Sequence, residues 1–140
     1  MEFDRLTRRI KFKIGDADYS GRLTLQSLEE VETALPPGET LVSLFVLKRP
    51  PTIPVMKRAF VVGLERNEKR VGPQAALEAY EKFIEENGVA ALFNLFYALV
   101  AASNLLGTKA SNDTLAKVGL LPKDDEDEEE EPEGEEAKNA

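Results

Sequence analysis

Carboxylate and basic side chains are the main groups with which this 140-residue chain could do chemistry, because it contains no cysteine and no histidine. The lack of cysteine excludes a thiolate nucleophile, a cysteine metal site and a disulfide framework. The lack of histidine removes the commonest general base and the commonest transition-metal ligand. No G-x-S-x-G, P-loop or dinucleotide-binding pattern occurs, and most carboxylates before the C-terminal segment fall on polar faces of predicted helices. We therefore predict that the chain is not an enzyme and holds no cofactor or metal.

The charge of the chain is concentrated at one end. The formal net charge is −8, but residues 124–140 contain eleven carboxylates and one lysine, a net of −10. The first 123 residues therefore form a faintly basic body with a net charge of +2. The acidic segment lacks the spaced Asp-x-Asp-x-Asp-Gly pattern of a specific calcium loop. We expect residues 123–140 to be a disordered, solvated tail that keeps the protein soluble, with a basic partner or mimicry of DNA as alternative uses.

The N-terminal part of the chain alternates with the period of two that is typical of half-buried strands. Ile10, Phe12 and Ile14 would cover the buried face, and the alternating basic residues Arg9, Lys11 and Lys13 would face water. Turn residues at 15–18 separate this segment from a second alternating segment, 19–25. The pattern predicts a β-hairpin, which needs a further element packed against it for stability.

Beyond residue 25 the apolar residues adopt the spacing of helices, which predicts an α+β fold that is mostly α. About four to five helices should follow the hairpin, with residues 1–107 forming one domain. Residues 40–47 suit either a buried strand or a short helix, because periodicity cannot separate the two. The predicted helices are 28–35, 52–66, 73–86 and 89–106, with 67–70 as a loop, 108–122 as a linker or short helix, and 123–140 as the tail.

Start and stop signals bound these helices. Either Thr24 or Ser27 could cap the first helix, and Thr52 has the place of an N-cap with a proline in the turn that follows. Asn87 and Gly88 form a strong stop between the last two long helices.

The helix predicted at 89–106 is apolar nearly all round, and three interpretations compete. A membrane span needs about 20 apolar residues, and this run falls short, carries Asn94 and lacks flanking basic clusters, so we predict no membrane. A helix of this kind is normally buried at the centre of a fold. One face could instead stay uncovered as a groove for an apolar partner helix. The groove interpretation assigns partner binding to Met56, Phe60, Leu92, Phe93, Phe96, Tyr97 and Val100.

Basic residues are too few to predict nucleic-acid binding. The pairs at 48–49 and 57–58 lack interleaved aromatic residues, which favours solvated helix ends. A more basic strip between Arg5 and Lys13 could receive the acidic tail or an acidic partner, but the solvated face of a hairpin explains it more simply. The chain begins Met-Glu-Phe-Asp, which lacks the apolar core of a signal peptide and favours the cytoplasm.

The order of these segments is familiar. A basic alternating segment at 8–15 leads to the Leu-Thr-Leu-Gln-Ser-Leu-Glu-Glu run at 23–30, then to a Met-Lys-Arg-Ala-Phe helix at 56–64. Phe-Ile-Glu-Glu-Asn-Gly at 83–88 precedes the long Ala/Leu helix. This order resembles the tail assembly chaperones of long-tailed phages and the related tail proteins of gene transfer agents. The resemblance covers about residues 8–106 and rests on pattern, not on a signature motif.

The resemblance implies a small phage or prophage protein with a strand pair followed by helices. Such chaperones bind the long, apolar, helical tape measure protein in the host cytoplasm before the tail tube polymerises around it. The implied partners are the tape measure protein or other tail proteins, with a homo-oligomer left open, and no catalytic residues carry over. The prolines at 50–51 and the length of the acidic tail depart from the family pattern. The alternatives are a structural tail component retained in the virion and a regulatory binding protein that uses its acidic tail.

Overall fold

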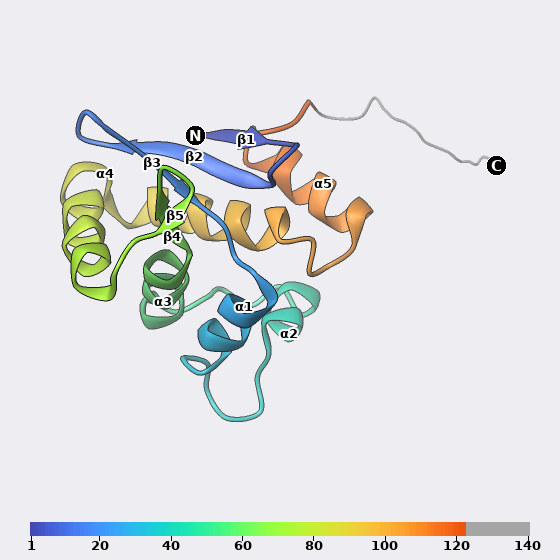
Figure 1. The fold of residues 1–140 in the computed structure, drawn as a ribbon. Coiled ribbons are helices and arrows are strands. Elements are labelled where there is room, and N and C mark those ends of the chain that lie inside the picture. Colours follow the sequence, from blue (N-terminus) through green and yellow to red (C-terminus); the bar gives the residue numbers. More distant parts are fainter. Residues whose placement is uncertain (123–140) are drawn as a thin grey trace.

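Residues 1–122 are described by the computed structural model and form an antiparallel sheet with a long central helix beneath it (Figure 1). This confirms the predicted α+β, mostly helical fold, whereas the predicted tail at 123–140 lies outside the described residues. The sheet has the order β1-β2-β3-β4-β5. The strands are β1 Glu2–Asp4, β2 Arg9–Ile14, β3 Ala17–Gly21, β4 Leu64–Arg66 and β5 Lys69–Arg70, and the helices are α1 Leu25–Glu32, α2 Leu41–Val46, α3 Ile53–Gly63, α4 Pro73–Ala102 and α5 Thr108–Lys117.

The predicted hairpin is the centre of the sheet. β2 pairs antiparallel with β3, and Phe12 lies opposite Tyr19. The inward-facing side chains of β2 are buried, as the alternation requires. The second strand ends at Gly21, short of the predicted end, because Leu25 already begins α1 and is exposed.

Three further strands, β1, β4 and β5, extend the sheet, and the sequence did not predict them. Phe3 of β1 lies opposite Ile10 of β2, and Glu65 of β4 lies opposite Arg70 of β5. The predicted loop at 67–70 is therefore correct only for the turn at 67–68, and the predicted extension of the preceding helix to residue 66 is wrong. The physical reason is length, since strands of two or three residues are too short to show a period.

Threonine caps three of the helices. The Thr24 hydroxyl accepts the backbone N–H of Ser27 at 3.1 Å, which decides between the two predicted caps, and Thr52 caps α3 as predicted. Thr40 and Ser43 form a reciprocal capping box, each side chain accepting the backbone N–H of the other at 3.0 Å. This cap explains why the undecided segment at 40–47 becomes the helix α2.

A sharp bend divides α4 into two arms at Gly88. The backbone there has φ 82° and ψ 176°, a region that is almost exclusive to glycine. The predicted stop is therefore present as a change of direction. The second arm ends at Ala102, earlier than predicted, and α5 is a full helix with Leu115 completely buried.

Strand β2 is fastened to α4 at both ends. The N–H of Gly15, in the turn after β2, donates to the Glu86 carboxylate at 2.7 Å, and Arg8 Nε, just before β2, donates to the Ala102 carbonyl at 2.7 Å. Between these points the sheet and helix approach closely, because a Cβ added at Gly21 would lie 2.6 Å from the Leu99 side chain. The sheet and the second arm of α4 thus form one packed unit.

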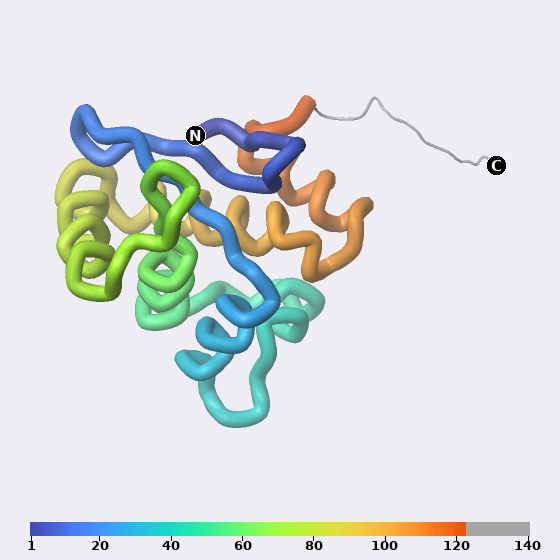
Figure 2. Tube along the Cα trace, viewed as in Figure 1, coloured from blue at the N-terminus to red at the C-terminus, as the bar shows by residue number. Residues whose placement is uncertain are grey.

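The core beneath the sheet is aromatic. The Phe12 ring lies 6.1 Å from the Phe60 ring and 5.9 Å from the Phe83 ring, and Phe60 lies 5.5 Å from Tyr80. These contacts join β2, α3 and the first arm of α4. On the side away from the sheet, the connection between α1 and α2 forms a wide loop (Figure 2).

Candidate functional site

The residues predicted to bind a partner are mostly core residues. Met56, Phe60, Leu92, Phe96 and Val100 are each at most 2% exposed. In this conformation their side chains cannot reach a partner. The prediction that these residues line an open groove is therefore corrected. The faces of α3 and α4 that carry most of the large apolar residues are covered by the other elements of the fold.

Phe93 and Tyr97 are the two predicted residues that stay half-buried. Their spacing of four residues places them on one face of the second arm of α4. The Tyr97 ring lies 5.3 Å from the Phe45 ring, edge to face, so α2 covers part of this face. Burial raises the pKa of the Tyr97 hydroxyl. The partner-binding role of this pair stays a prediction.

Helix α4 is also long and apolar enough to cross a membrane, judged by length and composition alone. The bend at Gly88 divides it into two arms, each shorter than the about 20 residues that a span requires. Of its most apolar window, 39% is buried inside the fold. A core helix of a folded domain has the same composition.

A groove lies on the face of α3 that points away from Met56 and Phe60, between α1, α3 and the start of α4. Its volume is about 480 Å³, which suits a few side chains of a docked segment. We call it the α1–α3–α4 groove. Its apolar lining consists of Ala34, Pro54, Val61, Val62, Pro73 and Leu77.

The charged residues of this groove are mainly basic. Lys57 and Arg58 of α3 and Arg70 of β5 lie along it, together with one carboxylate, Glu30. Arg70 pairs with Glu30 at 3.4 Å, and the Lys57 ammonium lies 5.6 Å from the centre of the Tyr80 ring. Within residues 1–122, neither Lys57 nor Arg58 forms an ion pair. The groove therefore combines an apolar lining with uncompensated positive charge.

Exposed apolar side chains are concentrated in the segment that runs from α2 to the start of α3. Among the described residues, half of the large apolar side chains that are exposed lie in α2, in the residue that follows it and at the start of α3. We call this set the α2–α3 corner. It consists of Val42, Val46, Leu47 and Ile53, and Ile53 directly precedes the groove residue Pro54.

The same part of the chain is free of acidic residues. Residues 40–64 contain four basic side chains and no aspartate or glutamate. Of the four, only Arg49 has a carboxylate partner among the described residues, Glu39. Exposed apolar groups beside unpaired positive charge are typical of a protein interaction surface.

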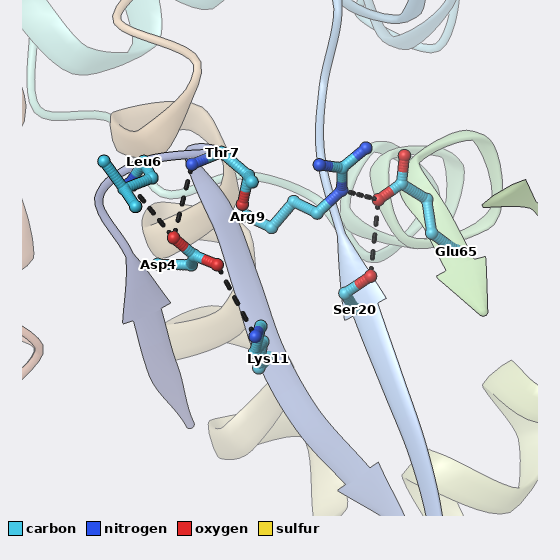
Figure 3. Close-up of polar contacts among 7 residues, drawn as sticks. All are labelled: Asp4, Leu6, Thr7, Arg9, Lys11, Ser20 and Glu65. Carbon is cyan, nitrogen blue, oxygen red and sulfur yellow. Dashed lines mark hydrogen bonds and ion pairs between the residues drawn. The ribbon is translucent and has the colours of Figure 1, made fainter. Parts of the chain in front are cut away.

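The most enclosed polar cluster is structural. Arg9 Nε donates to the Glu65 carboxylate at 2.7 Å, and Ser20 Oγ donates to the same oxygen at 3.3 Å (Figure 3). These residues link β2, β3 and β4 on the outer side of the sheet. The hydrogen bond with Glu65 raises the pKa of Arg9 still further, and a guanidinium is in any case always protonated in proteins, so it is unsuited to proton transfer. The prediction that Arg9 faces water was wrong.

No group of three or more carboxylates within residues 1–122 is arranged to hold a metal ion. Asp4 is held in its own turn, where it accepts the backbone N–H groups of Leu6 and Thr7 and pairs with Lys11 at 3.5 Å (Figure 3). The hydrogen bond from Thr7 is the main reason why the pKa of Asp4 is lowered. These contacts close the turn between β1 and β2.

Sequence reasoning missed the groove because it followed the largest apolar residues. In α3 the face with Met56 and Phe60 serves the core, and the groove uses the opposite, mixed face with Lys57, Arg58 and Val61. The available signal was the lack of acidic residues at 40–64. It identifies a basic segment but not which helices lie beside it.

No family model matches the chain, and neither a curated protein nor a solved structure matches it.

Proposed function

We propose that this protein is a non-enzymatic tail assembly chaperone that binds an apolar helical segment of a tape measure protein and keeps it in solution. The observation that carries the proposal is the α1–α3–α4 groove, which offers an apolar lining beside the exposed α2–α3 corner. An amphipathic helix that lays its apolar face in such a groove is a common mode of protein recognition. The link to tail assembly comes from the resemblance in the order of segments.

The buried residues of α4 have a supporting role in this proposal. Phe96 and Val100 pack in the core and hold the helices in place, so a partner would contact surface residues without disturbing the core. Phe93 and Tyr97 remain at the surface and could extend the contact area past Phe45.

Co-expression tests the proposal. The tape measure protein of the same gene cluster should be more soluble with the wild-type chain than without it. The variant Val61→Gln/Leu77→Gln should lose most of this effect, because both side chains are half-buried and line the groove. The control Leu6→Gln/Leu25→Gln makes the same kind of change at two leucines that are more exposed and do not line the groove. It should behave as wild type.

Two outcomes would count against the proposal. An unchanged soluble fraction of the tape measure protein with wild type would remove the chaperone role. Equal effects of the groove variant and the control would show that the groove is not the binding site.

A further inference from the structure

We infer that the α1–α3–α4 groove selects a helix whose apolar stripe is flanked by carboxylates, so that the partner is an acidic amphipathic helix. This inference rests on the proposed function and adds the chemical class of the bound segment. It is carried by the basic residues that line the groove and by the lack of carboxylate partners for two of them.

The spacing along α3 sets the arrangement. Pro54, Lys57, Arg58 and Val61 occupy positions i, i+3, i+4 and i+7 and therefore share one face of the helix. On this face an apolar residue lies at each end, about 10 Å apart along the axis, with the two positive charges between them. A partner helix with apolar residues on one stripe and carboxylates beside it has the complementary pattern.

The charge balance favours an acidic partner over a neutral one. Glu30 is the one carboxylate in the groove lining, and it already faces Arg70 at 3.4 Å. Lys57 contacts the face of the Tyr80 ring, which leaves its charge uncompensated by an anion. A neutral partner would cover both cations without pairing them, and this costs desolvation energy.

The chain's own acidic segment has the carboxylates but not the apolar stripe that the groove requires. Residues 123–140 supply many carboxylates, but their apolar side chains are only one proline, Pro132, and two alanines, Ala137 and Ala140. Such a segment could approach the charges but could not fill the apolar lining of the groove. An anionic membrane surface could also pair with the basic residues of the groove. The experiment must therefore distinguish a helical partner from the acidic segment and from a membrane.

Three synthetic helical peptides provide the main test. Each carries the same leucine stripe, and the flanking positions are all Glu, all Gln or all Lys. We expect the full chain to bind the Glu peptide at least tenfold more tightly than the Lys peptide at 50 mM salt, with the Gln peptide between them, measured by fluorescence anisotropy. The preference should shrink at least fivefold at 500 mM salt, because screening weakens exposed charge pairs.

Reversing the groove charge should reverse the preference. Lys57→Glu/Arg58→Glu should lose the Glu peptide by at least tenfold and gain the Lys peptide. The control Arg5→Glu/Lys117→Glu makes the same change in net charge at exposed sites on β1–β2 and α5, at the other end of the molecule (Figure 1), and should shift either affinity less than twofold. Both variants change exposed side chains, so unfolding does not obscure the comparison, and circular dichroism checks this.

The outcomes distinguish this inference from the proposed function. Equal binding of all three peptides would overturn charge selection and leave apolar helix binding in place. Binding of none of them, together with an unchanged soluble fraction of the tape measure protein, would overturn both. Binding of the 123–140 peptide, or of phosphatidylglycerol vesicles, that is lost in Lys57→Glu/Arg58→Glu would assign the groove to another occupant and overturn the inference.

Discussion

Arg9 and Glu65 are charged side chains that the fold encloses, at 9% and 8% exposure. Their ion pair joins β2 to β4 across β3, where Ser20 adds a third contact to Glu65. Removing one partner would leave the other charge enclosed without compensation, which typically costs about 3 kcal/mol. We predict that Glu65→Leu lowers the free energy of unfolding by roughly this amount in urea denaturation.

The double variant tests the physical reason. Arg9→Leu/Glu65→Leu removes both charges and should be clearly more stable than Glu65→Leu alone, since no charge is then left unpaired. The single variant Arg9→Leu completes the comparison. If the free energy of unfolding that the double variant loses equals the sum of the losses in Arg9→Leu and Glu65→Leu, the two side chains act independently and the ion-pair explanation fails.

Asp4 provides a pH-dependent contribution in the β1–β2 turn. Backbone N–H groups and Lys11 stabilise its charged form, so the pKa of the folded state lies below the ordinary value of 3.8. Stability from a lowered carboxyl pKa is present above the unfolded pKa and is lost as the pH falls through the folded pKa. Asp4→Asn should therefore be less stable than wild type at pH 7, and the difference should shrink below about pH 4.

The measurement is the thermal midpoint of both proteins between pH 2.5 and 7. Asparagine keeps an oxygen that can accept the N–H groups of the turn, so the variant isolates the charge from the turn geometry. A difference that is constant across this range would show that the charge of Asp4 is not responsible.

At the scale of elements, the bend at Gly88 places the two arms of α4. One arm carries Phe83 against Phe12, and the other carries Leu99 against Gly21. Gly88 has room for a side chain, since an added Cβ would meet nothing within 4 Å, but its φ of +82° is strained for other residues. We predict that Gly88→Ala costs about 1 to 3 kcal/mol of stability through the backbone alone.

Gly72→Ala serves as the matched control. Gly72 also has open space around it, but its φ is −62°, so alanine should cost less there. Denaturant unfolding of both variants provides the comparison. Equal losses would indicate that backbone strain at the bend is not the cause.

The sequence predicted those elements that have a period or a cap. The alternation at Ile10, Phe12 and Ile14 was sufficient for the β2–β3 hairpin, and Thr52 correctly marked the start of α3. Strands β1, β4 and β5 were missed because two or three residues are too few to show a period, and β4 also depends on pairing with the distant strand β3, which local propensity does not contain.

The candidate site was harder to predict than the fold. Apolar residues attract attention in a sequence, but the core uses most of them, including Leu92 and Phe96. What remains for a partner depends on how α1, α3 and α4 lie beside one another, as at Val61 and Leu77 in the groove. The sequence alone shows only one sign of the groove, the lack of acidic residues at 40–64.

At the scale of the whole molecule, the charge separates into two parts. Residues 1–122 contain fifteen acidic and sixteen basic side chains, a net charge of +1, and residues 123–140 supply the remaining −9. A nearly neutral body with the exposed α2–α3 corner should associate readily, because little net charge opposes contact. We therefore predict that the acidic segment keeps both the free protein and its complex in solution.

Neutralising the segment tests this prediction without shortening the chain. Replacing its eleven carboxylates by Asn and Gln leaves a net charge of about +3 by the charges in the sequence. Precipitation by ammonium sulfate should then begin at a lower concentration, while the thermal midpoint should change little, because the fold within 1–122 keeps its contacts. A matched variant that reorders the same carboxylates should precipitate as wild type does, since net charge and not sequence is what repels neighbouring molecules. If the reordered variant precipitates as early as the neutralised one, the segment acts through a specific contact instead.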